Sequence, residues 1–326
     1  MNKFTVNSKV VVFGSRGLVG SAIVRELNRQ GFKNILTPLR EELDLLDQSA
    51  VFNYFNSERP EYVYIAAAKV GGIVANNTYR GDFIYENITI QNNIFGAAHK
   101  YPVSGLIFLG SSCIYPKNAP QPIKEEYLLS SELEPTNEPY AIAKIAGLKT
   151  VQAMRQQYKH SWVSLMPTNL YGPNDNYHPE NSHVIPGMIR RMHEAKIRGD
   201  KTFTVWGTGK PRREFLYVDD LAKICLEVMA NIENAPDWMN VGTGVDMTIA
   251  KLAGVIQKVV GFKGELQFDT SRPDGTLRKL LDVSLLHKQY GQNHTDFEFG
   301  IKSSYEDFKT NYVKTITGVM PKSETL

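Results

Sequence analysis

A glycine turn near the start of the chain constrains the fold more than any other feature of the sequence. Gly14, Gly17 and Gly20 follow the apolar run of residues 10–13 and open residues 18–30, whose apolar positions have helical spacing. In such a strand–turn–helix unit the glycines let the backbone turn tightly and approach a pyrophosphate, which the free N–H groups of the helix N-terminus bind. The sequence therefore predicts a dinucleotide-binding α/β domain.

Strand and helix patterns alternate through the first half of the chain, which is typical of a doubly wound, Rossmann-type parallel sheet. Beyond the glycine turn, the predicted strands cover residues 34–39, 62–67, 105–109 and 162–166. The predicted helices cover residues 51–57, 82–100 and 139–158. We therefore expect the α/β fold class.

The pattern changes after residue 173, where a segment rich in Asn, His and Pro predicts a loop. We expect a Rossmann domain made of residues 1–173 plus 214–244. We expect residues 174–213 plus 245–326 to form a smaller, discontinuous C-terminal domain that binds the substrate.

Composition excludes several classes of partner. The chain of 326 residues has 37 basic and 34 acidic side chains and a formal net charge of +3, so nucleic acid is not the expected partner. Cys113 and Cys225 are too few for a disulfide framework, and no apolar run approaches the ~20 residues of a membrane span. We expect a cytoplasmic protein with no membrane contact and no metal site.

The end of the second predicted strand bears on the choice between NADP and NAD. NAD enzymes usually carry an acid there for the ribose 2′-hydroxyl, whereas here the strand ends in Arg40 and the glycine turn contains Arg16. Because Arg binds phosphate through a bidentate fork, these two residues favour a 2′-phosphate and hence NADP(H). Glu41 and Glu42 leave NAD open. Asp44 either reaches the adenine end of the cofactor or only precedes a helix.

A Ser, a Tyr and a Lys predict chemistry at a carbonyl group. Ser111 follows the predicted strand 105–109 and so lies at the sheet edge where ligands of open α/β sheets bind. Tyr140 and Lys144 are four residues apart on a predicted helix and share a face. The ammonium can then lower the pKa of the phenol from ~10 toward the working pH, so that the Tyr exchanges a proton.

Together, these residues resemble the extended type of the short-chain dehydrogenase/reductase family. The resemblance implies that Tyr140 exchanges a proton with the substrate oxygen, that Lys144 also holds the nicotinamide ribose, and that Ser111 orients the carbonyl. The residues expected at the cofactor are Gly14, Ser15, Arg16, Gly17, Leu18, Val19, Gly20, Arg40, Asp44, Leu109, Gly110, Ser111, Ser112, Lys144, Pro167, Thr168, Asn169, Leu170 and His183.

Further segments narrow the resemblance to one branch of that family. This branch contains NADPH-dependent 3,5-epimerase/4-reductases that convert GDP-4-keto-6-deoxy-D-mannose to GDP-L-fucose. The segments are residues 69–77, 111–116, 134–144, 166–173 and 181–186.

By this resemblance, Cys113 and His183 are the pair that epimerises the sugar. Epimerisation beside a ketone needs one group to remove a proton and another to return one on the opposite face. An ordinary thiol, with a pKa of ~8.5, and an imidazole, with a pKa near ~6.5, suit these roles. On the residues alone, Cys113 is more often a small buried residue and His183 more often a loop histidine.

Four residues are candidates for binding a GDP-sugar. The resemblance places Arg191, Trp206 and Arg213 on this substrate, where Arg213 can neutralise a diphosphate and Trp206 offers an aromatic surface. Asp274 can bind a ribose or sugar hydroxyl, although it also fits a turn acid ahead of a glycine. On the residues alone, a solvated helix face explains Arg191 and a core position explains Trp206 equally well. Leu277 replaces a Pro that is common in the family, which leaves the shape of this loop open.

The resemblance also implies a homodimer formed through helices 82–100 and 139–158, whose apolar residues can equally pack on the sheet. Two other functions stay open. One is another nucleotide-sugar 4-epimerase or reductase, and the other is a non-catalytic NADP-sensing protein on the same fold. A dehydratase is disfavoured, because Ser112 and Cys113 stand where the resemblance would want an Asp-Glu pair.

Overall fold

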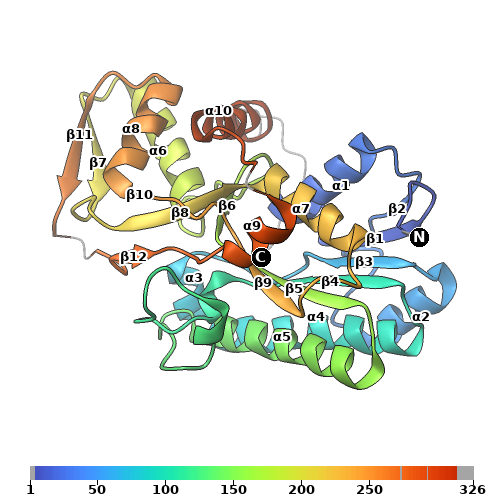
Figure 1. The fold of residues 1–326 in the computed structure, drawn as a ribbon. Coiled ribbons are helices and arrows are strands. Elements are labelled where there is room, and N and C mark those ends of the chain that lie inside the picture. The colour runs from blue at the N-terminus through green and yellow to red at the C-terminus, as the bar shows by residue number, and fades with distance from the viewer. Residues whose placement is uncertain (1–3, 272–273, 292, 314–326) are drawn as a thin grey trace.

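The larger part of the molecule is built on a parallel sheet (Figure 1). The computed structural model describes residues 4–271, 274–291 and 293–313. The strands of the sheet are β1 (Lys9–Phe13), β2 (Asn34–Leu36), β3 (Tyr62–Ile65), β4 (Gly105–Leu109), β5 (Trp162–Pro167) and β9 (Trp238–Val241). Their order is β2-β1-β3-β4-β5-β9, and all neighbouring strands run parallel. The predicted doubly wound α/β class is confirmed.

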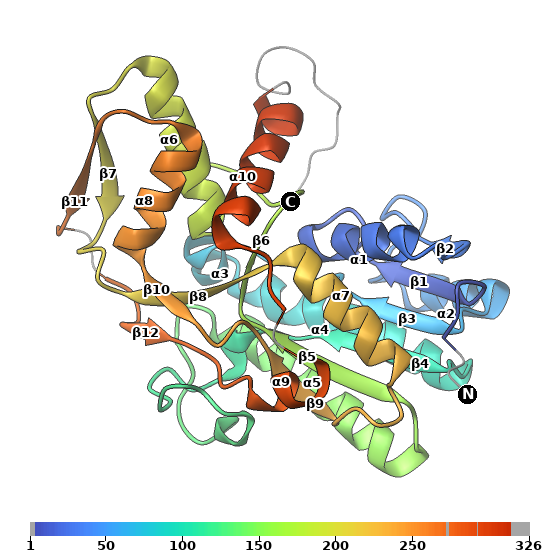
Figure 2. The same cartoon turned by 45° about the horizontal axis from the view of Figure 1, so that its top comes forward.

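Helices cover both faces of this sheet, as Figures 1 and 2 show. On one face, α1 (Leu18–Arg29) packs against α7 (Val218–Ala230). On the other face, α4 (Arg80–Lys100) packs against both α5 (Glu138–Tyr158) and α2 (Gln48–Glu58). Within the part of the chain that the structure describes, no helix combines the length and apolarity needed to cross a membrane.

A smaller lobe stands beside the sheet and has a core of its own. It consists of α6, α8, α10 and the strands β7, β8 and β10 to β12. The helices are α6 (Val184–Arg198), α8 (Ile249–Val260) and α10 (Phe297–Asp307). The strands are β7 (Thr202–Trp206), β8 (Arg212–Tyr217), β10 (Asp246–Thr248), β11 (Glu265–Asp269) and β12 (Arg278–Lys279). β8 pairs with β10, with β12 and with β6 (Asn169–Tyr171), which links the sheet to this lobe. The remaining short helices are α3 (Ile73–Thr78), η1 (Ser112–Ile114), η2 (Glu125–Tyr127), α9 (Ser284–Tyr290) and η3 (Phe308–Val313).

The chain returns to the large sheet after β12. Leu281, Val283 and Leu286 belong to the same buried cluster as Val10 and Ile107 of the large sheet. The predicted domain boundaries stay a prediction, and residues 314–326 of the second predicted domain lie outside the described residues.

The second strand is shorter than the sequence predicts. β2 ends at Leu36, two residues before Pro38, which has no N–H to donate to a strand ladder. The chain then turns, because the backbone N–H of Leu43 donates to the carbonyl of Leu39 at 2.8 Å. Arg40 therefore lies in a turn beyond the strand end.

Candidate active site

The glycine turn lies where the order of the sheet reverses, between β1 and β3. Gly14 has φ +82°, and a Cβ on it would lie 2.6 Å from the backbone nitrogen of Ala67, which follows β3. A Cβ on Gly20 would lie 2.0 Å from the carbonyl oxygen of Gly14. Gly17 is the N-cap of α1 and carries no side chain to occupy the first N–H groups of the helix. This cradle fits a dinucleotide pyrophosphate.

The two arginines predicted at the ribose lie on the same edge of the sheet. Arg16 and Arg40 are both exposed, and Arg16 Nη1 lies 4.0 Å from Glu41 Oε2, next to Arg40 in the chain. A surface ion pair at this distance holds the guanidinium weakly, so Arg16 remains able to bind a phosphate. The exposed Asp44 accepts a hydrogen bond from the N–H of Leu46 at 2.9 Å and does not cap α2, because Asp47 does.

Ser111, Cys113 and Tyr140 form one cluster at the C-terminal end of β4. Ser111 is the N-cap of η1, and its Oγ accepts a hydrogen bond from the N–H of Cys113 at 3.2 Å. The side chain of Tyr140, near the start of α5, is hydrogen-bonded to that of Ser111. The edge of the Phe83 ring packs against Tyr140 with centroids 6.3 Å apart. Two hydroxyl groups and a thiol thus meet at one point.

Lys144 lies beside this cluster and is buried. Its Nζ donates a hydrogen bond to the carbonyl of Leu109 at 2.9 Å and lies 5.8 Å from the centre of the Tyr140 ring. Burial lowers the pKa of Lys144 to about 7. Burial, together with the nearby Cys113, raises the pKa of Tyr140, whereas the hydrogen bond from Ser111 opposes this rise. The expected lowering of the Tyr140 pKa is therefore wrong for this structure, since desolvation of the phenol is the largest effect on it.

His183 enters from the smaller lobe. It is the N-cap residue of α6 and is exposed, yet surrounding protein lowers its pKa. The loop before it is fixed to the larger lobe, because the N–H of Gly72 donates to the carbonyl of Asn181 at 3.1 Å. Among the described residues, the structure records no direct contact between His183 and Cys113.

The remaining residues predicted at the cofactor line the same edge of the sheet. The N–H of Gly110 donates to the carbonyl of Leu165 at 2.9 Å and continues the ladder past Leu109. Pro167 ends β5, and the N–H of Thr168 donates to the carbonyl of Val241 at 2.9 Å. The other predicted positions lie in the glycine turn and α1 (Ser15, Leu18, Val19), in η1 (Ser112) and in β6 (Asn169, Leu170).

The predicted substrate residues lie in the smaller lobe. The Arg191 guanidinium on α6 lies 4.7 Å from the centre of the Trp206 ring, which is 59% exposed. Arg213 on β8 donates to the carbonyl of Thr276 at 2.5 Å. Burial lowers the pKa of both guanidinium groups. Both carboxylate oxygens of Asp274 accept hydrogen bonds from Thr208, at 2.9 and 2.7 Å.

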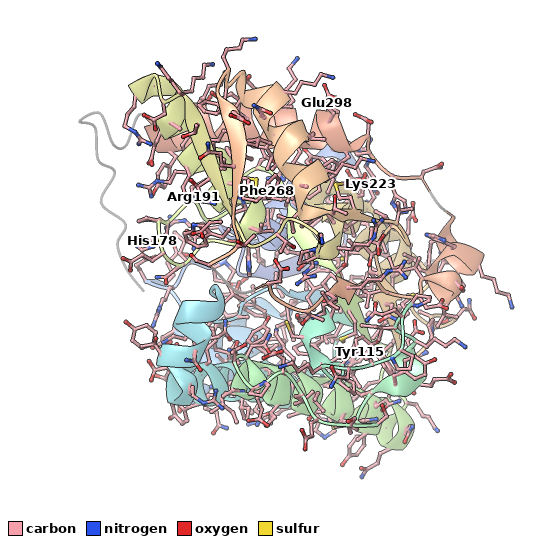
Figure 3. All side chains as sticks on the ribbon, turned by 90° about the vertical axis from the view of Figure 1, so that its left-hand side faces the viewer. Tyr115, His178, Arg191, Lys223, Phe268 and Glu298 are labelled. Carbon is pink, nitrogen blue, oxygen red and sulfur yellow. The ribbon has the colours of Figure 1, made fainter. Side chains whose placement is uncertain are left out.

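Figure 3 labels Arg191 and Phe268 in the smaller lobe and Tyr115 in the larger one. Two contacts involve the predicted substrate residues. One is the stack of Arg191 on Trp206, and the other is the bond that holds Arg213 to the loop with Thr276 and the 73% exposed Leu277. Asp274 connects the two, because it is bonded to Thr208 and precedes Gly275, where a Cβ would lie 3.2 Å from the Arg213 guanidinium.

Comparison with known proteins agrees with this geometry. Residues 10–242 match the model of the NAD dependent epimerase/dehydratase family. The chain belongs to this family.

Individual members of the epimerase/dehydratase family are similar over almost the whole chain. The GDP-L-fucose synthase of Escherichia coli (strain K12) is 53% identical over 93% of this chain and 97% of its own length. The structure of a GDP-L-fucose synthetase from Naegleria fowleri bound to NADP has a TM-score of 0.87 at 29% identity, over 95% of each chain. A GDP-mannoheptose C4 reductase from Campylobacter jejuni with NADP bound has a TM-score of 0.87 at 38% identity, over 94% of this chain and 100% of that one.

Two residues lie at the site for which the sequence alone suggests no role. Lys279 on β12 brings its Nζ to 4.0 Å from the Sγ of Cys113. Glu214 on β8 is fully buried, and burial raises its pKa. Its carboxylate accepts hydrogen bonds from the N–H groups of Thr243 and Gly244, each at 2.7 Å, and of Leu281 at 3.0 Å. For each of them, the sequence offers one local sign of a role, which is a charged residue within a strand.

Proposed function

We propose that this chain converts GDP-4-keto-6-deoxy-D-mannose to GDP-L-fucose, by 3,5-epimerisation followed by NADPH-dependent reduction of the 4-keto group. The observation that carries the proposal is the cluster of Ser111, Cys113 and Tyr140, with Lys144 buried beside it. Reduction needs only the hydroxyls and the lysine, whereas the thiol adds a base at the same point. The names of the most similar relatives support this substrate.

The residues present fit NADP(H). Gly14 and Gly20 leave room for a pyrophosphate at the N-terminus of α1, and the exposed Arg16 and Arg40 suit a 2′-phosphate. When bound, the nicotinamide supplies the hydride that reduces C4. Lys144 lies next to the end of β4, where its ammonium would hold the ribose of the nicotinamide.

Epimerisation comes first and uses groups from both lobes. The thiolate of Cys113 removes the proton from C3, and hydrogen bonds from Ser111 and Tyr140 stabilise the negative charge on the C4 oxygen of the enolate. The imidazolium of His183 returns a proton to the opposite face of C3, and the same pair then acts at C5. Burial lowers the pKa of His183, which favours release of a proton from the imidazolium to the sugar carbon.

Reduction uses residues of the larger lobe alone. Ser111 orients the carbonyl, and Tyr140 donates a proton to the C4 oxygen as the alcohol forms. The raised pKa of Tyr140 keeps the phenol protonated and ready to donate before reaction. With a pKa of about 7, Lys144 can pass a proton to the phenolate after the step.

The nucleotide end of the substrate lies against the smaller lobe in this proposal. Arg213 and Arg191 bind the diphosphate, Trp206 stacks on the sugar or base, and Asp274 orders the loop through Thr208. Two copies of the chain pair through α4 and α5, where the exposed side chains include Tyr85 and Ile142. The protein works in the cytoplasm.

The proposal is tested with purified protein, GDP-4-keto-6-deoxy-D-mannose and NADPH, by following the loss of reduced-nicotinamide absorbance and identifying the sugar product. We expect NADPH oxidation with GDP-L-fucose as the product. The variant Cys113→Ser should still oxidise NADPH but fail to form the L-sugar, because the Ser hydroxyl is a far weaker acid than the thiol. Cys225→Ala, which changes a buried cysteine of α7, is the matched control and should keep the product unchanged.

Two results would contradict the proposal. Oxidation of NADPH by the unmodified protein without change at C3 and C5 would identify a 4-reductase instead. NADPH binding without any oxidation on this substrate would favour another nucleotide-sugar or the sensing function.

A further inference from the structure

A lysine from the smaller lobe reaches the cysteine at the centre of the site. Lys279 Nζ lies 4.0 Å from Cys113 Sγ, although the two residues are 166 positions apart in the chain. Cys113 is partly buried in η1 of the larger lobe, and Lys279 is partly buried at the end of β12. The contact therefore joins the two lobes at a reactive side chain.

The backbone around Lys279 is fixed on both sides. β12 pairs with β8, where Lys279 lies opposite Arg213. The N–H of Leu280 donates to Gln121 Oε1 at 2.8 Å, and the N–H of Ile123 donates to the carbonyl of Leu280 at 2.8 Å. These bonds join the lysine strand to the segment that follows Cys113 in the chain. The fold thus fixes the backbone position from which the Lys279 side chain reaches Cys113.

In residues 4–271, 274–291 and 293–313, no acid neutralises the charge of Lys279. Among the described residues, no carboxylate forms an ion pair with it, whereas Arg278 next to it pairs with Asp246 at 2.5 Å. Tyr140 is the other titratable group recorded against Cys113, and burial raises its pKa, so it carries no charge near neutral pH. In the part of the chain that the structure describes, the Lys279 ammonium is therefore the charged group recorded next to Cys113 Sγ.

We propose that Lys279 is a positioning residue for epimerisation, whose ammonium favours the thiolate form of Cys113. An opposite charge within about 4–6 Å favours the ionised form of a group, and the thiolate is the form that acts as a base. Cys113 loses its thiol proton to solvent, Lys279 takes no part in the proton transfer, and the thiolate then accepts the C3 proton and becomes a thiol again. The inference rests on the function proposed above.

The test is the pH dependence of iodoacetamide alkylation at Cys113 in the free protein, with the modified peptide quantified by mass spectrometry. In Lys279→Met we expect the midpoint of alkylation to move up by about one pH unit and the rate below the midpoint to fall about tenfold, since that rate follows the thiolate fraction. Lys279→Arg keeps the charge and should restore most of the rate. Arg278→Met, the matched control on the same strand, should leave the midpoint in place.

The outcomes separate this inference from the proposed function, because alkylation needs no sugar. An unchanged midpoint in Lys279→Met, with NADPH binding and circular dichroism intact, would overturn the inference. A midpoint that moves equally in Arg278→Met would also overturn it, because it would show that disturbing β12 is enough. If Lys279→Met does not fold, Lys279→Gln is measured in its place and must show the same upward shift of the midpoint, and an unchanged midpoint there would overturn the inference. Failure to make GDP-L-fucose in the unmodified protein concerns the proposed function alone.

Discussion

The residues proposed for reduction and those proposed for epimerisation come from different parts of the molecule. Ser111, Tyr140 and Lys144 all belong to the larger lobe, where β4 and α5 hold them through a hydrogen bond and a buried ammonium. Epimerisation combines Cys113 of that lobe with His183 at the start of α6 and Lys279 on β12. The reducing half is thus built on one sheet, whereas the epimerising half depends on how the two lobes meet.

The two lobes also differ in how tightly their candidate residues are held. Lys144 is 3% exposed and surrounded by protein, whereas Trp206 is 59% exposed. A preformed arrangement lowers the cost of aligning reacting groups, and an open one can adapt to a large substrate. Changes in the larger lobe should therefore affect chemistry, and changes in the smaller lobe should affect substrate binding.

The largest effect is expected at the reducing half. Tyr140→Phe removes the proton donor, so kcat for reduction should fall about 10²- to 10⁴-fold while NADPH binding persists. Steady-state kinetics with the keto-sugar measure this. Tyr64→Phe is the matched control, because the Tyr64 hydroxyl is buried in β3 and has no hydrogen-bond partner among the described residues. Equal losses in both variants would mean that the Tyr140 effect is structural.

Two helical glycines, one in each lobe, give the next comparison. In Gly20→Ala the new Cβ would meet the Gly14 carbonyl oxygen at 2.0 Å, so we expect a loss of about 1–3 kcal/mol in unfolding free energy and weaker NADPH binding. A Cβ at Gly254 in α8 would meet no atom within 4 Å, so Gly254→Ala should instead stabilise the protein by about 1 kcal/mol. Urea denaturation and NADPH titration measure both. If Gly20→Ala changes neither the unfolding free energy nor NADPH binding, the argument for a tight phosphate site at the glycine turn fails.

The sequence predicts the features of the site that depend on residues close together in the chain. The glycine turn and the pairing of Tyr140 with Lys144 depend on spacings of a few residues, so local periodicity was enough to predict them. The position of Ser111 followed from one strand end. The alternation of strands and helices predicts a doubly wound parallel sheet, which the structure confirms, whereas the order of its strands comes from the structure alone.

Contacts between distant segments could not be predicted in this way. Lys279 meets Cys113 across 166 residues, and the buried Glu214 joins β8 to segments near Thr243 and Leu281. No periodicity in one sequence shows such pairings. The pKa of Tyr140 was also predicted in the wrong direction, because spacing shows the ammonium but not the degree of burial.

Substitutions in the smaller lobe should change the binding of the keto-sugar. Arg213→Met removes a guanidinium proposed to contact the diphosphate, so KM for the keto-sugar should rise about tenfold with little change in kcat. Arg212→Met, the neighbouring arginine that pairs with Asp246 at 2.6 Å, is the control and should leave KM almost unchanged. A normal KM in Arg213→Met would mean that this arginine serves only to hold Thr276.

The last comparison concerns the segment that connects the lobes, where a buried acid makes stability depend on pH. Asp175 follows β6, and burial raises its pKa to about 7, with Asp307 adding to the rise. Because this pKa lies above that of the unfolded chain, the ionised form is disfavoured by folding. Stability is then gained as pH falls from 7 toward 4 and is lowest above 7, with a slope of about 1 kcal/mol per pH unit in that window.

Replacing Asp175 should make the free energy of unfolding depend less on pH. Asp175→Asn carries no titrating group, so its unfolding free energy should exceed that of the unmodified protein most at pH 8 and converge with it near pH 4. Chemical denaturation across this range measures the difference, and Asp200→Asn, which removes a surface acid paired with Arg198, should keep the original slope. If Asp175→Asn keeps the slope as well, the connecting segment is solvated and the lobes are joined more loosely than the buried carboxyl implies. In that case the epimerising half, which depends on both lobes, should lose activity on heating before the reducing half does.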